Sequence, residues 1–291
     1  MVAAAWRIPG KVMRNRSTPL AAHAFPSWRR LGGALGLLVL LAGCGGNKGA
    51  DAVPDQPPED LYRQAQALLD REDYEKAGKA FEEVERQHPY SQWATRGELM
   101  AAYSYYQANK YDDAVAAAER YIDLHPGNHD VPYAYYMVGQ SYYEQISDVG
   151  RDQDMTQKAL SSFTELIRRY PDSSYASDAK LKIDLVRDHL AGKEMEVGRF
   201  YQKRQLWLAG INRFQKVVTE YQTTTHVPEA LHRLTESYLA LGMLEQAQES
   251  AAVLGYNFPG SEWYQRSYAL LQGKHLEPQA SQSGSWLSRL F

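Results

Sequence analysis

The chain has 291 residues, a formal net charge of −3 at pH 7, 44% hydrophobic residues and one cysteine. A single cysteine cannot form an internal disulfide, so a small fold held together by disulfides is excluded. The lone thiol is then an inert core group, a nucleophile or an attachment point, and its neighbours in the sequence distinguish these roles.

The N-terminal segment has the pattern of a secretory signal. Six basic residues and no acidic residue precede Cys44, and the apolar stretch 31–41 that follows them is too short to span a bilayer as a helix. The stretch ends in LAGC (41–44), which resembles a bacterial lipobox, in which the cysteine sulfur receives a diacylglycerol. We expect residues 1–43 to be a lipoprotein signal peptide and Cys44 to carry the lipid. The alternative is a buried free cysteine in a hydrophobic N-terminal helix.

Residues 44–59 are expected to form the lipidated end and a flexible tether, because GGNKGADAVPDQPPE is rich in Gly, Pro and Asp. Lipoproteins that the inner membrane retains usually have Asp after the cysteine, whereas this chain has Gly45, which implies an outer membrane. A mature chain starting at Cys44 would keep 26 basic residues against 35 acidic ones, a formal net charge of about −9. Such a charge argues against nucleic acid or an anionic membrane surface as a partner.

A repeat runs through residues 60–273. Segments share an alanine, a residue four positions later that packs from the next turn, and a proline that ends the helix. The four clearest segments are 74–89, 111–126, 159–171 and 244–259, and in the first and third of them Phe81 and Phe163 are expected to be buried between helices. The helices before them resemble the first half of a tetratricopeptide (TPR) repeat. We therefore predict an all-α fold, an α-solenoid of about five degenerate TPR helical hairpins, followed by a disordered tail at 274–291.

One unit departs from the pattern. Gly210 and Phe214 fit its second helix, but Gln222 occupies the proline position, and its first helix must lie within 174–201. The polar composition of residues 145–157 predicts an insertion between the two helices of the preceding unit.

Most of the 21 tyrosines fall inside the repeats. A tyrosine has a large apolar body and one polar tip, which suits half-exposed positions between helices and binding grooves alike. Tyr105 and Tyr142 are expected in the core, since they face the partner helix. Tyr103 and Tyr106 are then the better candidates for a binding groove.

No set of residues supports catalysis or a cofactor. His125 and His129 have the spacing of a zinc site on one helix, but a Pro-Gly pair between them breaks the helix. Three aspartates in the inserted segment, Asp148, Asp152 and Asp154, lack the glycine and terminal glutamate of a calcium loop. Nucleophile elbows and glycine-rich phosphate loops are missing from the sequence. We expect no enzyme, no metal and no cofactor.

Three longer stretches resemble the BamD family, the TPR lipoproteins of the outer-membrane β-barrel assembly machinery. They are NHDVPYAYYMVGQSYY (128–143), RRYPDSSYASDA (168–179) and EVGRFYQKRQLWLAGINRF (196–214). The likeness extends over about residues 58–251. It implies a non-catalytic scaffold, lipid-anchored in the outer membrane and facing the periplasm. By that resemblance the protein binds the barrel-forming subunit, accessory lipoproteins and unfolded precursors of outer-membrane proteins.

The resemblance also suggests which residues make these contacts. Arg213 is the candidate for a charged contact with the barrel-forming subunit, the alternative being that it caps or solvates a helix face. Tyr103 and Tyr106 are the candidates for precursor binding. A different class of function shares the same signals: a periplasmic TPR adaptor that coordinates cell-wall synthesis enzymes or an envelope-spanning complex.

Overall fold

The computed structural model describes residues 56–279, and every regular element in that range is an α-helix. The helices are α1 (Pro58–Leu69), α2 (Tyr74–Gln87), α3 (Gln92–Gln107), α4 (Tyr111–Leu124), α5 (Val131–Glu144), α6 (Asp154–Arg169), α7 (Ala176–Lys203), α8 (Trp207–Glu220), α9 (Val227–Ala240), α10 (Leu244–Asn257) and α11 (Glu262–Gln272). The predicted all-α fold is confirmed. The expected signal peptide, Cys44 and residues 280–291 lie outside the described range.

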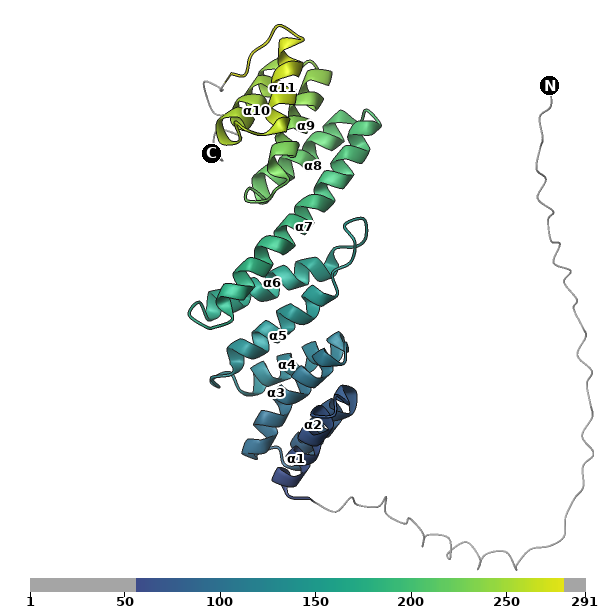
Figure 1. Ribbon diagram of the computed structural model, residues 1–291, viewed down its shortest axis with the longest axis vertical. Helices are drawn as coiled ribbons and strands as arrows, with labels where there is room; N and C mark the ends of the chain where they lie inside the picture. Colours follow the sequence, from purple (N-terminus) through teal and green to yellow (C-terminus); the bar gives the residue numbers. More distant parts are fainter. Residues whose placement is uncertain (1–55, 280–291) are drawn as a thin grey trace, which may run out of the picture. The chain divides into compact units, whose positions relative to one another are not determined.

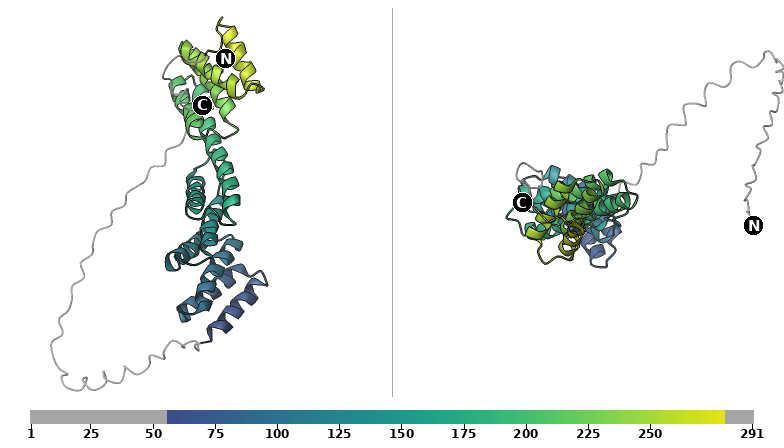
Figure 2. Two further views of the ribbon diagram at one scale, coloured as in Figure 1. Left: turned by 90° about the vertical axis from the view of Figure 1, so that its left-hand side faces the viewer. Right: turned by 90° about the horizontal axis from the view of Figure 1, so that it is seen from above.

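The first ten helices form five hairpins stacked in chain order (Figure 1). Each helix packs against the next one along the chain, so α2 contacts α3 just as α1 contacts α2. The two further views show the same succession from α1 to α11 (Figure 2). In the first three hairpins the first helices also meet, α1 with α3 and α3 with α5. The stacked hairpins enclose a core that continues from each one to its neighbour, as in the predicted TPR-like α-solenoid.

A left-handed residue links the two helices of four hairpins. Its φ lies between 57° and 74° at Glu72, Asn109, Gln205 and Gly242. The amide of the following residue donates to a carbonyl five residues back, as in a Schellman turn, and the N···O distance is 2.9–3.0 Å. The third hairpin instead has a longer connection, residues 145–153, where the sequence predicted an insertion.

The fourth hairpin ends like the others although Gln222 replaces the proline. The residue that ends its second helix, Tyr221, has φ −125° and ψ 43°, close to the −137° and 62° of His88 in the first hairpin. The hydroxyl of Thr224 donates to the Tyr221 carbonyl at 2.8 Å. Packing and this hydrogen bond therefore end the helix without the steric stop of proline.

α11 is the first helix of an incomplete sixth unit. It packs on α9 and α10, and the same left-handed turn follows it at His275, where φ is 56°. No second helix follows within the described residues. The chain runs back along α10 instead, where the Gln248 side chain donates to the Glu277 carbonyl at 2.7 Å and Leu276 packs against the core. The segment that follows the predicted boundary at residue 273 is thus mostly exposed, but Leu276 and the Glu277 carbonyl still contact the packed body.

Large aromatic rings fill the space between helices and lie over glycines. Phe81 and Phe163 are fully buried, as predicted, and Tyr105 is buried as well. Tyr142 is only half-buried and lies beneath the Lys158 ammonium group, 5.7 Å from its ring centroid. It packs against the core on both sides of its helix pair without being fully buried, so the predicted core position is reached only in part. Four glycines, Gly78, Gly139, Gly198 and Gly255, lie so close to a ring that a Cβ atom would meet it at 2.4–2.7 Å.

Replacing Gly198 by valine is expected to destabilise the fold by about 1–3 kcal/mol through overpacking. A Cβ atom on Gly198 would lie 2.4 Å from Cε1 of the fully buried Phe214, so the ring or the helix must move. Combining the change with Phe214→Leu should cost less than the sum of the two single changes, because the smaller side chain makes room. Urea unfolding followed by circular dichroism measures both quantities.

The matched control is Gly127→Ala, since a Cβ atom there meets no heavy atom within 4 Å. Additive losses in the double variant, or equal losses for Gly198→Val and the control, would contradict this account of the packing.

Candidate partner-binding site

Tyr103 and Tyr106 lie on α3 and are both half-buried. The Tyr106 hydroxyl accepts from the Gln140 side-chain amide at 3.1 Å and donates to Glu144 Oε1 at 3.3 Å, and both partners belong to α5. Within residues 56–279, the Tyr103 hydroxyl makes no hydrogen bond. Tyr103 therefore keeps a polar tip that is open to a ligand.

Three further tyrosines join this pair. Tyr133 and Tyr136 come from α5, and Tyr175 is the N-cap residue immediately before α7. The Tyr175 ring centroid lies 5.3 Å from that of Tyr133 and 5.3 Å from that of Tyr136, and the second pair is stacked. Together with Tyr103 and Tyr106 they form what we call the tyrosine face, built from the first helices of the second, third and fourth hairpins.

Burial favours the uncharged form of the Tyr133 and Tyr136 hydroxyl groups in this face. It is the largest cause that raises the pKa of Tyr133, and the neighbouring tyrosines raise it further. Burial also raises the pKa of Tyr136, whose hydroxyl donates to Asp178 Oδ2 at 2.6 Å. Tyr133 and Tyr136 therefore stay protonated in neutral solution, and the face offers polar hydroxyl groups on large apolar rings.

Sequence reasoning missed part of this face. The spacing of Tyr133 and Tyr136 on one predicted helix was a usable signal, because residues three apart share a helix face. Tyr175 gave no such signal, since it reaches the cluster from a different hairpin.

Arg213 lies on α8 and faces α7. Its Nη1 donates to Glu194 Oε2 at 3.0 Å, while Lys216 Nζ donates to the other carboxylate oxygen at 2.7 Å. Burial would raise the pKa of Glu194, but the hydrogen bonds from Lys216 and Arg213 outweigh it and lower the pKa. Glu194 is thus a buried anion that holds both cations.

Arg213 still has donors to offer a partner. Its side chain is 42% exposed, and a guanidinium has five N–H donors, of which one contacts Glu194. It lines a cavity of about 500 Å³ together with residues of the 145–153 connection and of α7. Tyr103 and Tyr106 lie on α3 of the second hairpin and Arg213 lies on α8 of the fourth, so the structure does not bring the two predicted sites together (Figure 1).

His125 and His129, which have the spacing of zinc ligands, interact with different carboxylates. His125 Nε2 lies 3.0 Å from Oε2 of the buried Glu98, whereas His129 pairs with its neighbour Asp130 at 3.1 Å. Among residues 56–279, no three His, Cys, Asp or Glu side chains are grouped so that they could hold a metal ion.

One group has the residue types of a serine hydrolase triad. His232 Nδ1 lies 2.8 Å from Ser267 Oγ, and its Nε2 lies 3.6 Å from Glu236. Ser267 has no exposed surface, so its oxygen cannot meet a substrate in this arrangement. The contact joins α11 to α9.

The described helices do not include a membrane span: none between residues 56 and 279 is both long and apolar enough to cross a bilayer. The predicted anchor at Cys44 lies outside this range.

A family model described as outer membrane lipoprotein (YfiO) matches residues 54–254, from α1 to most of α10. The chain is 48% identical over 240 residues to the outer membrane protein assembly factor BamD of Caulobacter vibrioides, covering 82% of this chain and 79% of that protein. It is 45% identical over 234 residues to the BamD of Rickettsia prowazekii, covering 80% and 93%. A solved thermophilic TPR protein of Thermus thermophilus is similar at 19% identity with a TM-score of 0.35, covering 74% of this chain and 100% of that one.

Proposed function

Because the chain belongs to the BamD family of outer membrane lipoproteins, we propose that it is an outer membrane protein assembly factor that acts as a non-catalytic scaffold. It is anchored by lipid on Cys44 in the outer membrane and faces the periplasm. Its partners are the barrel-forming subunit, accessory lipoproteins and unfolded precursors of outer-membrane proteins. The observation that carries this proposal is the pair of chemically different surfaces, the tyrosine face and the region around Arg213, whose predicted contact residues Tyr103, Tyr106 and Arg213 lie on the second and the fourth hairpin.

The tyrosine face suits weak capture of an unfolded chain. Its rings offer apolar area, and the Tyr103 hydroxyl can donate to a peptide carbonyl without the desolvation cost of a full charge, whereas those of Tyr106 and Tyr136 already donate to Glu144 and Asp178. The Tyr103 hydroxyl has no hydrogen-bond partner within residues 56–279, so a peptide need not displace an internal bond there. Precursor binding through Tyr103 and Tyr106 follows from these properties.

Arg213 suits a fixed contact with a folded partner. Glu194 orients its side chain, and an oriented guanidinium loses less rotamer freedom when it binds a carboxylate. We infer that a carboxylate of the barrel-forming subunit binds there. Reversing the charge at Arg213 would place a second acid against Glu194, so alanine is the cleaner substitution for a test.

Partner binding is expected to be divided along the solenoid. Each hairpin touches only its neighbours, so a surface change in one hairpin should leave a distant hairpin folded. Arg213→Ala should weaken binding of the barrel-forming subunit and spare precursor binding. Tyr103→Ala combined with Tyr106→Ala should do the reverse, because it removes the aromatic area. Pull-downs of each variant with each partner, with circular dichroism as the folding check, measure this.

Lys216→Ala is the control for Arg213→Ala, since it removes the other cation that binds Glu194 and leaves the guanidinium in place. If either test variant lost both partners while remaining folded, a single shared surface would have to replace the divided one. If Lys216→Ala matched Arg213→Ala, the effect would come from the Glu194 ion pair and not from a contact of Arg213 with the partner.

A further inference from the structure

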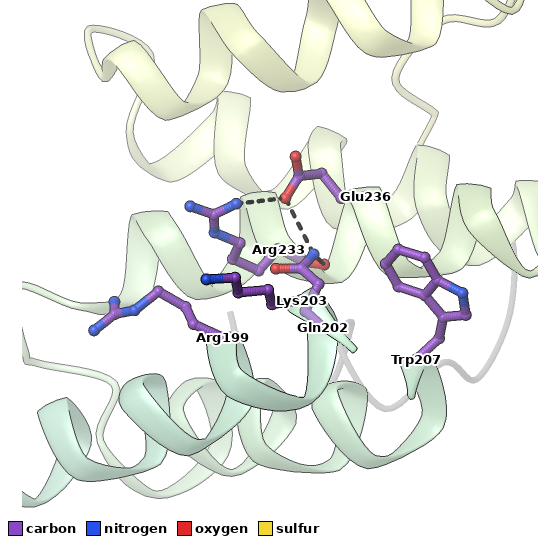
Figure 3. A pocket seen from close by; sticks show the side chains of 6 residues that line it. All are labelled: Arg199, Gln202, Lys203, Trp207, Arg233 and Glu236. Atoms are coloured by element: carbon purple, nitrogen blue, oxygen red, sulfur yellow. Dashed lines mark hydrogen bonds and ion pairs between the residues drawn. The ribbon is translucent and has the colours of Figure 1, made fainter. Parts of the chain in front are cut away.

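A second basic site lies where the end of α7 meets the start of α8 and the middle of α9 (Figure 3). A cavity of about 420 Å³ opens there, and we call it the basic tryptophan pocket; its lining residues are Arg199, Gln202, Lys203, Trp207, Arg233 and Glu236. It shares no lining residue with the cavity that contains Arg213, and α7 presents different residues to each.

Glu236 organises the floor of this pocket. Its Oε2 accepts from Arg233 Nη1 at 2.9 Å and from the Gln202 side-chain amide at 3.1 Å (Figure 3). Burial alone would raise the pKa of Glu236, but the interactions with His232 and Arg233 outweigh it and lower the pKa to about 2. The carboxylate is therefore ionised at any ordinary pH, and it fixes Arg233 and Gln202 in place.

The carboxylates do not neutralise all of the positive charge in the pocket. Arg233 also bonds to Glu229 at 3.2 Å, and Arg199 bonds to the same carboxylate at 3.1 Å. Lys203 is exposed, and no acidic group within the described part of the chain pairs with it. Three cations thus face two carboxylates, which leaves one positive charge at the open side of the pocket, between Arg199 and Lys203.

Trp207 forms the opposite wall. Its ring stands across the pocket from Arg199 and Lys203 (Figure 3) and is half-buried. Within residues 56–279, no aromatic ring or cation packs on the Trp207 ring. Two other tryptophans do have such partners: the ring centroids of Trp93 and Tyr62 are 5.0 Å apart, and the Arg266 guanidinium lies 4.7 Å from the ring centroid of Trp263. A tryptophan and an uncompensated cation on opposite walls of one pocket have the composition of an interface hot spot.

We propose that the basic tryptophan pocket binds an acidic segment of a partner polypeptide, with one carboxylate between Arg199 and Lys203 and a neighbouring apolar or aromatic side chain against Trp207. A single carboxylate matches the one uncompensated positive charge. A phosphate dianion fits less well, because its second charge would face Glu229 and Glu236 and its compact shape would leave the indole unused. The proposal goes beyond the assembly role, since it uses neither Arg213 nor the tyrosine face.

The test uses the full-length protein in mild detergent and a fluorescently labelled peptide, capped at both ends, with one Asp-Phe pair among glycines and serines. We expect anisotropy to report saturable binding that weakens with added salt. Lys203→Glu should raise the Kd at least about tenfold, because a like charge then meets the aspartate. Trp207→Ala should also weaken binding, and the same peptide with Asn-Phe in place of Asp-Phe should bind less tightly to the wild type.

Lys180→Glu is the matched control, since it reverses an exposed lysine on the same helix, far from the pocket, and gives the same net charge. Equal Kd values for Lys203→Glu and Lys180→Glu would overturn the proposal, as would wild-type protein that binds no peptide at millimolar concentration. Glycerol phosphate serves as a probe for lipid headgroups. If it bound in a manner that depended on Lys203 while the peptide did not, the site would belong to a phosphate ligand and the proposal would be overturned.

Discussion

Replacing Cys44 by serine is expected to abolish acylation and signal-peptide cleavage together. The sulfur is the proposed acyl acceptor, and Cys44 is the only cysteine in the chain, so no other thiol can substitute for it. Each buried methylene of an acyl chain contributes about 0.8 kcal/mol to membrane binding, so two or three chains hold a protein almost permanently, and the variant lacks this lipid anchor. Signal cleavage should fail in the same variant, because it follows acylation.

Membrane fractionation and intact-mass measurement check this result. The wild type should sediment with the membrane and carry the added mass of its acyl chains on a chain that begins at Cys44. Asn47→Ser is the control, since it introduces serine three residues later and keeps the thiol. A wild-type protein with an unmodified mature N-terminus would refute the anchor, and so would a Cys44→Ser variant that is still acylated or still cleaved before residue 44.

The sequence predicted the repeat well because the repeat is a local pattern. Alanine, a residue four positions later and a helix-ending proline recur at spacings that a reader can align, and they correctly placed Phe81 and Phe163 in the core. The same procedure ended the solenoid at residue 273, since α11 has no second helix whose pattern could be recognised. The left-handed turn at His275, visible only in the backbone, identifies α11 as a further half-unit.

The candidate sites were less predictable because they depend on contacts between hairpins. Arg213 was identified as a charged candidate, but its bond to Glu194 joins residues 19 positions apart on neighbouring helices. The tyrosine face combines α3, α5 and the residue before α7, whose alignment depends on how the hairpins stack. The basic tryptophan pocket likewise combines residues of three helices. Lys203 and Trp207 line it together because of the left-handed turn between α7 and α8, which the spacing of residues in the sequence does not predict.

Truncating Phe163 to alanine is expected to lower the free energy of unfolding by about 3–5 kcal/mol, at the upper end of large-to-small core changes. The ring is fully buried, and Tyr136 and Tyr143 lie against it with centroid distances of 6.1 and 6.4 Å. Beneath it lies Gly139, where a Cβ atom would be 2.6 Å from the ring. Glycine has no side chain that could move into the space, so the cavity persists and the cost stays high.

Chemical unfolding of the purified protein measures this loss, with Trp286→Ala and Phe291→Ala in the C-terminal segment as aromatic controls. Both controls are expected to change stability very little, because we predict the segment to be a disordered tail.

A second variant tests the cause. Adding Gly139→Ala to Phe163→Ala should recover part of the lost stability, since the new methyl group enters the vacated space and alanine favours the helix by about 1 kcal/mol over glycine. In the wild-type background Gly139→Ala should instead be destabilising, because its methyl group meets the ring. The same sign of effect in both backgrounds, or equal losses for Phe163→Ala and the tail controls, would show that the ring over glycine does not hold this hairpin together.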